Sequence, residues 1–232
     1  MNEAGIAWEP CDPWRGESLP SLDGYGAVLA LGGPQQSDEE HLHPWLAEEK
    51  ALMREAVARG FPVLGVCLGC QLLADAHGGR VGPLDRAEIG ILDYRLTAAG
   101  RADLLFAGLP LAPLALQWHF YAVLALPERA TLLASSPASA IQAFRLGERA
   151  YGVQFHTELG AAEVRETEAF PAYVAALERQ QGAGAFERLV AETSRHEATL
   201  KNNGLRLFKN FARLLDTGNI GRPVFQSAYR RS

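Results

Sequence analysis

The chain has 232 residues, of which 48% are hydrophobic and 21% charged, so its composition and length fit one globular domain or one domain with an extension. The formal net charge of −5 supplies no basic field for a phosphate backbone, which argues against a nucleic-acid partner. No apolar run approaches the roughly 18 residues of a membrane span, and the start lacks a charged stretch followed by an apolar one. Three cysteines are too few for a disulfide framework, so we expect a cytoplasmic protein without membrane contact.

The first half of the chain alternates strand and helix patterns. Residues 1–24 are irregular, and the apolar run over 26–33 ends in glycines and predicts a buried strand. Residues 43–60 show helical spacing and end in a glycine. A second strand is predicted over 61–66 and a short helix over 71–79. This order predicts parallel strands in an α/β sheet.

The second half changes from strands to helices. Strand-like segments joined in part by short turns cover 88–97, 114–117, 130–135, 140–146 and 150–155. The short turns indicate that some of these strands are antiparallel. From about residue 163 to 216 the pattern is helical, with a break near 182–184, and residues 217–232 are predicted to be a loose tail.

The segment G-V-C-L-G-C-Q (65–71) places Cys67 between a predicted strand and a predicted helix. Gly65 and Gly69 lie two residues to either side, and a tight strand-to-helix elbow requires such small neighbours. An elbow strains its central residue and exposes that side chain. The helix N-terminus favours a thiolate, and the N–H of Leu68 is free to bind a developing oxyanion. The pattern therefore predicts a cysteine nucleophile that attacks a carbonyl.

Cys67 and Cys70 also form a C-x-x-C pair, which occurs in redox sites and in zinc sites. Redox pairs usually enclose bulky or rigid residues, whereas this pair encloses Leu-Gly. Zinc needs two further ligands, and no second C-x-x-C and no H-x3–5-H is present. The H-x-E of zinc deaminases precedes a P-C-x-x-C, but here H-T-E follows the cysteines and Val66 precedes Cys67. We interpret Cys70 as a packing residue, and a buried inert Cys67 remains the simplest alternative to a nucleophile.

A thiolate nucleophile requires a base, and the base requires a partner that orients it. Four of the six histidines fall in a polar loop or on predicted helices, which leaves His119 and His156. His156 follows a predicted strand, where α/β sites gather, and Glu158 lies two residues further on. Alone, such a pair is an ordinary surface contact, but together with Cys67 it predicts a Cys-His-Glu triad.

These residues together resemble a class I (triad-type) glutamine amidotransferase, close to the stand-alone GMP-synthase-like members. The matching segments are L-A-L-G-G-P-Q (29–35), H-P-W-L-A-E-E-K-A-L-M-R-E-A (43–56), P-V-L-G-V-C-L-G-C-Q-L-L-A (62–74), G-G-R-V-G (78–82), W-H (118–119), L-L-A-S-S-P (132–137), Q-A-F-R (142–145) and Y-G-V-Q-F-H-T-E (151–158). The resemblance covers most of residues 22–216. It implies a flavodoxin-like fold, in which helices flank a mostly parallel central sheet. The implied parts are an amidotransferase core over 1–162, a helical extension over 163–216 and a tail over 217–232.

The resemblance also implies roles for individual residues. Cys67 would attack the side-chain amide of glutamine, His156 would act as the base and then protonate the departing ammonia, and Glu158 would orient His156. The oxyanion hole would use the N–H groups of Gly33 and Leu68. Substrate-binding roles fall on Gly32, Gln71, His119 and Tyr121. No metal ion and no other cofactor is implied.

Three departures from the family pattern stand out. Thr157 replaces the usual proline of H-P-E, and Phe120 and Tyr121 replace a glycine and an acidic residue that often follow W-H. The family also begins with a strand and a helix that have no counterpart here. Losing that strand would expose unpaired sheet edges, so we expect the natural chain to start further upstream.

Three functions are consistent with these patterns. The first is hydrolysis of glutamine, with ammonia passed to a synthetase on another chain, because no G-x-x-x-x-G-K-[ST] segment follows. The second, favoured by the change at Phe120 and Tyr121, is hydrolysis of a γ-glutamyl amide or conjugate without ammonia transfer. The third is a catalytically weak subunit that binds and regulates a partner.

Overall fold

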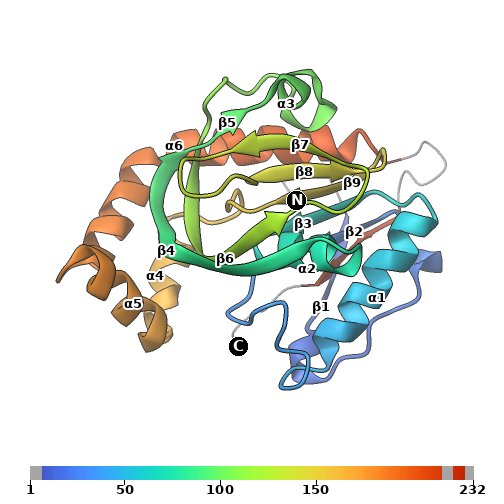
Figure 1. Ribbon diagram of the computed structural model, residues 1–232, viewed down its shortest axis with the longest axis horizontal. Coiled ribbons are helices and arrows are strands. Elements are labelled where there is room, and N and C mark those ends of the chain that lie inside the picture. The colour runs from blue at the N-terminus through green and yellow to red at the C-terminus, as the bar shows by residue number, and fades with distance from the viewer. Residues whose placement is uncertain (1–6, 216–221, 228–232) are drawn as a thin grey trace.

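The computed structural model describes residues 7–215 and 222–227, and an eight-stranded sheet forms its centre (Figure 1). Its strand order is β1 (Trp8–Cys11), β10 (Val224–Ser227), β2 (Ala27–Ala30), β3 (Val63–Val66), β9 (Ala150–Val153), β8 (Ala143–Leu146), β7 (Ala130–Ser135) and β5 (Arg95–Leu96). The first five strands in this order are parallel, and the last three are joined by antiparallel pairing. The predicted mixed α/β sheet is therefore confirmed.

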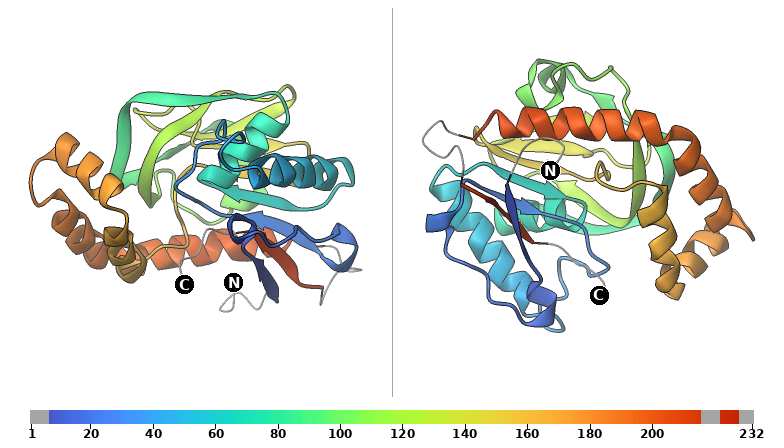
Figure 2. Two further views of the ribbon diagram at one scale, coloured as in Figure 1. Left: turned by 90° about the horizontal axis from the view of Figure 1, so that it is seen from below. Right: turned by 180° about the vertical axis from the view of Figure 1, so that it is seen from behind.

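Helices cover both faces of this sheet (Figure 2). One face packs on α1 (Trp45–Ala58) and α2 (Leu68–Ala76), and the other packs on the long helix α6 (Ala185–Ala212). The remaining helices are α3 (Ala98–Ala102), α4 (Ala161–Glu166), α5 (Pro171–Gln181) and 3-10 turns at Pro13–Arg15, Leu22–Gly24, Leu104–Phe106 and Thr167–Ala169. Parallel strands read as continuous apolar runs because both faces are buried, and all four residues of β2 and of β3 are buried.

A separate two-stranded antiparallel sheet pairs β4 (Arg80–Asp93) with β6 (Leu114–Ala125). Strand β4 begins before the predicted segment 88–97 and ends within it, and β6 extends beyond the predicted segment 114–117. The pairing shifts register between Pro83 and Glu88, which interrupts the alternation that marks a strand in the sequence. The W-H pair at 118–119 therefore lies within β6, where Trp118 is opposite Ile89 and His119 is opposite Glu88.

The C-terminal segment corrects two predictions. Residues 217–232 are predicted to be a loose tail, yet β10 lies between β1 and β2 and pairs with both, Phe225 being opposite Glu9 and Val28. β1 itself lies in the region predicted to be irregular. The sheet edge that a missing strand would expose is therefore paired by β10 and β1. All four residues of the short V-F-Q-S run are buried, so no alternation of apolar and polar positions marks it as a strand. Residues 216–221 and 228–232 lie outside the described residues.

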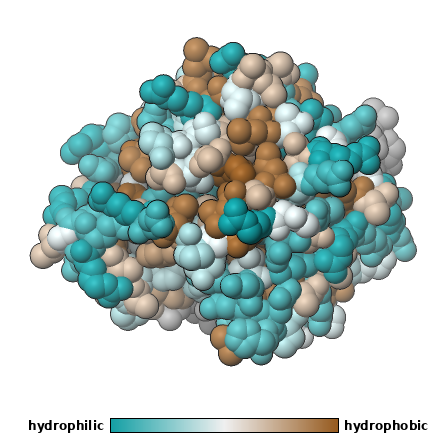
Figure 3. Space-filling view, in the orientation of Figure 1, coloured by the Kyte–Doolittle hydropathy of each residue, from teal (hydrophilic) through white to brown (hydrophobic). Residues whose placement is uncertain are grey.

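The helical region agrees with its prediction, and its break is explained by backbone conformation. Gly182 and Gly184 have positive φ values of 85° and 74°, which glycine adopts without a Cβ penalty, and the chain turns there from α5 to α6. Within the described residues, no helix is long and apolar enough to cross a membrane. On the face seen in Figure 3 hydrophobic residues gather near the middle, and hydrophilic residues dominate the rim.

Candidate active site

Cys67 is the residue on which strand β3 turns into helix α2. Its φ of 53° and ψ of −108° lie in a region that residues with a side chain rarely adopt. Its backbone N–H donates to the Val153 carbonyl at 2.9 Å, which ties the turn to β9. The predicted strain is therefore present, but the side chain of Cys67 is only 7% exposed, whereas the elbow pattern predicts an exposed one. Helix α2 begins directly after Cys67 rather than at Gln71 as the sequence pattern indicates.

Backbone contact explains the two glycines that flank the elbow. A Cβ on Gly69 would lie 2.2 Å from the Ala30 carbonyl oxygen, and one on Gly65 would lie 2.4 Å from the Gly69 carbonyl oxygen. Such contacts cannot be relieved by a side-chain rotation because both partners are backbone atoms. The glycines therefore allow β2, β3 and α2 to approach closely enough to hold Cys67 at the sheet's carboxyl edge.

His156 and Glu158 form an ion pair directly after β9. The Nδ1 of His156 is 2.7 Å from Oε1 of Glu158, and the histidine also interacts by a side-chain hydrogen bond with Cys67. Burial disfavours the imidazolium, but the charges of Glu158 and Cys67 outweigh it and raise the pKa of His156 well above 6.5. For Glu158, burial acts to raise the pKa, but His156 and two backbone N–H groups lower it overall. The ion pair with Glu158 thus favours the charged form of His156.

Thr157 adds a hydrogen bond that the usual family proline could not make. Its backbone N–H donates to Oε2 of Glu158 at 2.8 Å, and proline has no N–H. Its carbonyl oxygen lies against α6, where a Cβ on Gly204 would be 2.1 Å away. The departure at Thr157 thus holds the second oxygen of Glu158, while α6 supports the loop from behind.

One cavity of about 470 Å³ contains Cys67, His156 and Glu158 together. The glycine-rich loop after β2 forms part of its wall, with Gly32, Gly33 and Pro34. A Cβ on Gly32 would lie 3.0 Å from Cε1 of His156 and 3.4 Å from Cβ of Cys67, so glycine leaves the site open. Leu68 is the first residue of α2, and the first N–H groups of a helix have no acceptor within it. Of the two residues predicted to donate to an oxyanion, Gly33 thus lines the same cavity as Cys67, and Leu68 directly follows Cys67.

The far wall of this cavity comes from residues that the sequence patterns do not single out. They are contributed by β6 and by the segment around α4 and α5, and they are Trp118, Glu163, Glu166, Thr167, Phe170 and Tyr173. The ring of Tyr173 lies 6.1 Å from that of Trp118 and 5.4 Å from that of Phe120. Phe120, one of the departures from the family pattern, thus holds α5 over the cavity. Among these residues only Trp118 belongs to a segment that matches the family, W-H at 118–119. The residues from α4, α5 and the segment between them belong to no motif.

His119, predicted to bind substrate, instead lies in a buried network. Its Nδ1 lies 3.0 Å from the Tyr121 carbonyl oxygen, which can only accept, so this nitrogen carries a proton. Its Nε2 lies 3.1 Å from Oε2 of Glu88, and Glu88 also accepts from Gln142 at 2.7 Å. Neither His119 nor Tyr121 is among the described residues that line the cavity. Their placement supports the wall of the site rather than contact with a substrate.

Gln71, also predicted to bind substrate, is buried on α2 with its amide engaged elsewhere. Its Nε2 donates to the Tyr121 carbonyl at 2.9 Å and to Oε1 of Gln154 at 3.2 Å. Gln154 is fully buried, and its Nε2 lies 3.7 Å from Sγ of Cys67. The sequence gives one clue to Gln154, which is its place two residues before His156.

Cys70 lies on the buried side of α2 and is free, as are Cys11 and Cys67. It has no exposed surface, and a Cβ on Gly152 would lie 2.9 Å from its sulfur, so it packs against β9. Burial, with a contribution from Cys67, raises the pKa of Cys70 well above 9.0 and disfavours its thiolate. Among the described residues no group of three or more His, Cys, Asp or Glu side chains is arranged to hold a metal ion.

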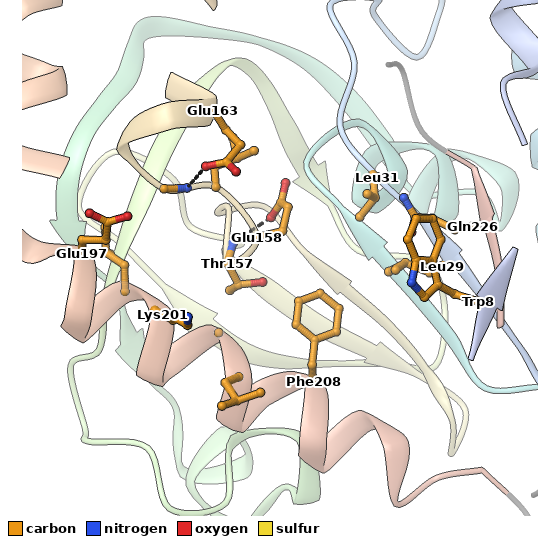
Figure 4. Close-up of a pocket in the computed structure, with 15 residues that line it drawn as sticks. Trp8, Leu29, Leu31, Thr157, Glu158, Glu163, Glu197, Lys201, Phe208 and Gln226 are labelled. Carbon is orange, nitrogen blue, oxygen red and sulfur yellow. Dashed lines mark hydrogen bonds between the residues drawn. The ribbon is translucent and has the colours of Figure 1, made fainter. Parts of the chain in front are cut away.

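A second cavity of about 680 Å³ also borders Glu158 (Figure 4). Helix α6 contributes one wall with Glu197, Lys201 and Phe208, and Trp8 of β1 forms part of the opposite wall. The two cavities share Glu158 and three neighbours of it, Leu31, Leu159 and Glu163. The triad carboxylate thus lies at the junction of two spaces.

A family model described as glutamine amidotransferase class-I matches residues 11–171, which include the elbow, the glycine-rich loop and the His-Glu pair. The chain belongs to the class-I glutamine amidotransferase family. The match confirms the resemblance that the sequence motifs indicate, and it runs from the last residue of β1 to the first residue of α5.

Relatives and solved structures agree with this assignment. The chain is 36% identical over 149 residues to the glutamine-hydrolyzing GMP synthase of Aeropyrum pernix, covering 62% of this chain and 26% of that protein. It is 34% identical over 158 residues to the glutamine amidotransferase-like protein YfeJ of Salmonella typhimurium, covering 66% and 64%. A glutamine amidotransferase structure from Thermotoga maritima superposes with a TM-score of 0.79 at 29% identity, covering 93% of this chain and 90% of that one. The chain spans about a quarter of the GMP synthase and under two thirds of YfeJ.

Proposed function

We propose that this class-I glutamine amidotransferase hydrolyses the side-chain amide of glutamine to glutamate and ammonia through a thioester on Cys67. The observation that carries this proposal is the strained elbow of Cys67 beside the His156–Glu158 ion pair, in a single cavity. A sulfur nucleophile, a base and an orienting carboxylate are the groups that acyl transfer requires.

The chemistry follows from these positions. The Cys67 thiolate attacks the γ-carbonyl carbon and forms a C–S bond, and the N–H groups of Leu68 and Gly33 bind the resulting oxyanion. When the intermediate collapses, the C–N bond breaks and the imidazolium of His156 protonates the leaving nitrogen, which departs as ammonia. Water, deprotonated by the now neutral His156, then attacks the thioester, and glutamate leaves as the thiolate re-forms. Glu158 stabilises the imidazolium in both proton-transfer steps.

The experiment is a comparison of glutamate release from glutamine by the wild-type chain and by Cys67→Ala. Turnover by the wild type that is lost in the variant is the expected result. Equal activity in both proteins, or none in a folded wild type, would overturn the proposal. Retained fold in the variant is checked by circular dichroism, so that a lost activity reports on chemistry.

A second candidate substrate class is a γ-glutamyl amide or conjugate. The aromatic side chains of Trp118, Phe170 and Tyr173 favour it, because a cavity of about 470 Å³ that they line in part accommodates an organic leaving group as well as ammonia. Release of glutamate from γ-glutamyl amines but not from glutamine would select this candidate. If the chain turns over neither substrate but binds a partner protein tightly, the third function, a regulatory subunit, is selected.

We further propose that the ammonia passes to a separate synthetase. The second cavity supports this, since it adjoins the proposed triad at Glu158 and extends from there along α6, on the sheet face opposite α1. The measurement is glutamine-dependent amination by a candidate synthetase in the presence of the chain, with added ammonia as the control that bypasses it. Amination supported by ammonia but never by glutamine plus this chain would exclude that synthetase as the acceptor.

A further inference from the structure

Within the described part of the chain, Gln154 and His156 are the two polar side chains that interact with the sulfur of Cys67. Gln154 is fully buried between β9 and the His156 loop, and its backbone N–H donates to the Gln142 carbonyl at 2.8 Å. Its side-chain Nε2 lies 3.7 Å from Sγ of Cys67, a distance suited to an N–H donating to sulfur. The question is therefore which atom of the Gln154 amide, its nitrogen or its oxygen, faces Cys67.

The orientation of this amide is set by its neighbours. The Tyr121 carbonyl oxygen can only accept, so the atom of Gln71 that faces it at 2.9 Å is the amide nitrogen. The second N–H on the same nitrogen is directed at Gln154, 3.2 Å away, and therefore meets the oxygen of that side chain. With its oxygen turned to Gln71, Gln154 must turn its own nitrogen to the sulfur. The chain of bonds thus leaves a donor, not an acceptor, facing Cys67.

A donor at this place has a definite electrostatic effect. An N–H directed at a sulfur stabilises the thiolate relative to the thiol, because hydrogen bonds to the charged form favour it. It also fixes the direction of the sulfur within the elbow. The charged or titratable groups that surround Cys67 from the other elements are His156, Glu158, Cys70, Tyr173, Glu163 and Glu166.

We infer that Gln154 binds the Cys67 thiolate through its amide N–H and that Gln71 is a positioning residue which fixes this amide. The inference rests on the proposed function, in which Cys67 is the nucleophile. In this inference Gln71 orients the amide of Gln154, whereas its motif implies a contact with the substrate. It also connects the site to β6 through the Tyr121 carbonyl.

The test measures the rate at which iodoacetamide alkylates Cys67 as a function of pH, in a Cys11→Ser, Cys70→Ala background. Gln154→Leu is expected to slow alkylation at neutral pH about tenfold, equivalent to about 1.4 kcal/mol, and the difference is expected to narrow at high pH, where every thiol is ionised. Gln71→Leu is expected to slow alkylation at neutral pH by a smaller factor, with the same narrowing at high pH. The effect is smaller because the Gln154 amide remains but is free to turn. A purely structural role would change the melting temperature and leave this pH dependence unchanged.

The second variant is Gln154→Glu, which is nearly isosteric with the wild type. It tests whether Gln154 donates to the Cys67 thiolate even if Gln154→Leu does not fold. A carboxylate beside the sulfur removes the donor and adds repulsion, so alkylation at neutral pH is expected to slow by at least as much. A folded Gln154→Glu that is alkylated at the wild-type rate across the pH range would overturn the inference. Because alkylation needs no glutamine, this result is separable from a failure of the wild type to hydrolyse glutamine, which would overturn the proposed function instead.

Discussion

The C-terminal strand is the feature whose removal should most clearly affect the stability of the sheet. Phe225 of β10 is 1% exposed, lies between Glu9 of β1 and Val28 of β2, and contacts the ring of Tyr25 edge-on at 5.7 Å. Replacing a buried phenylalanine by alanine costs about 3–5 kcal/mol through lost burial and the cavity that remains. Because domains of this kind are stable by roughly 5–15 kcal/mol, Phe225→Ala should remove a large fraction of the free energy of unfolding.

Urea unfolding followed by circular dichroism measures this loss. The matched control is Leu111→Ala, which truncates a large apolar side chain that is 66% exposed, and which should change the free energy of unfolding by no more than about 0.5 kcal/mol. If Phe225→Ala were no more destabilising than Leu111→Ala, the C-terminal segment would not lie in the sheet, and the account of how β1 and β2 are paired would be wrong.

Two further predictions concern the catalytic site. Gly69→Ala would place a Cβ 2.2 Å from the Ala30 carbonyl oxygen, so we expect destabilisation of about 1–3 kcal/mol, as for other overpacked sites, together with loss of glutamine hydrolysis; an unchanged melting temperature and rate would contradict the close approach. Glu158→Gln removes the charge that, against the effect of burial, raises the pKa of His156 above 6.5. The imidazolium should then be lost at a lower pH than in the wild type, which NMR titration of the ring protons measures, and an identical titration in the two proteins would show that Glu158 does not hold the charge.

Local patterns predict the elements that hold Cys67 because each of these elements is specified by its own residues. The apolar run before Cys67, the glycines at 65 and 69 and the short helix after it specify an elbow without reference to the rest of the chain. His156 and Glu158 follow from a strand end and a two-residue spacing. Cys67 follows β3, and His156 comes shortly after β9. The parallel pairing of β3 with β9 is therefore enough to bring the two residues to the same edge of the sheet.

Features that depend on distant pairing are not visible in the sequence. β10 has only four residues, and it forms a strand by pairing with β1 on one side and β2 on the other. Its own residues carry no strand pattern, which is why the sequence predicts a tail. The residues that cover the cavity come from α5, which has no motif, and they lie over the site because Phe120 and Trp118 pack on Tyr173. Gln71 matches a family motif, yet the orientation of its side chain depends on two hydrogen bonds to residues 50 and 83 positions away in the sequence.

The central claim is that Cys67, and not its neighbour Cys70, forms the covalent bond with the substrate. Intact-mass spectrometry after incubation with a diazoketone analogue of glutamine tests this directly, since the reagent alkylates the thiolate that occupies the glutamine site. The wild type and Cys70→Ala should each gain one inhibitor-derived mass, with the label mapped to residue 67, and Cys67→Ala should gain none. Labelling of Cys67→Ala to the same extent as the wild type, or a label mapped to Cys70, would contradict the account.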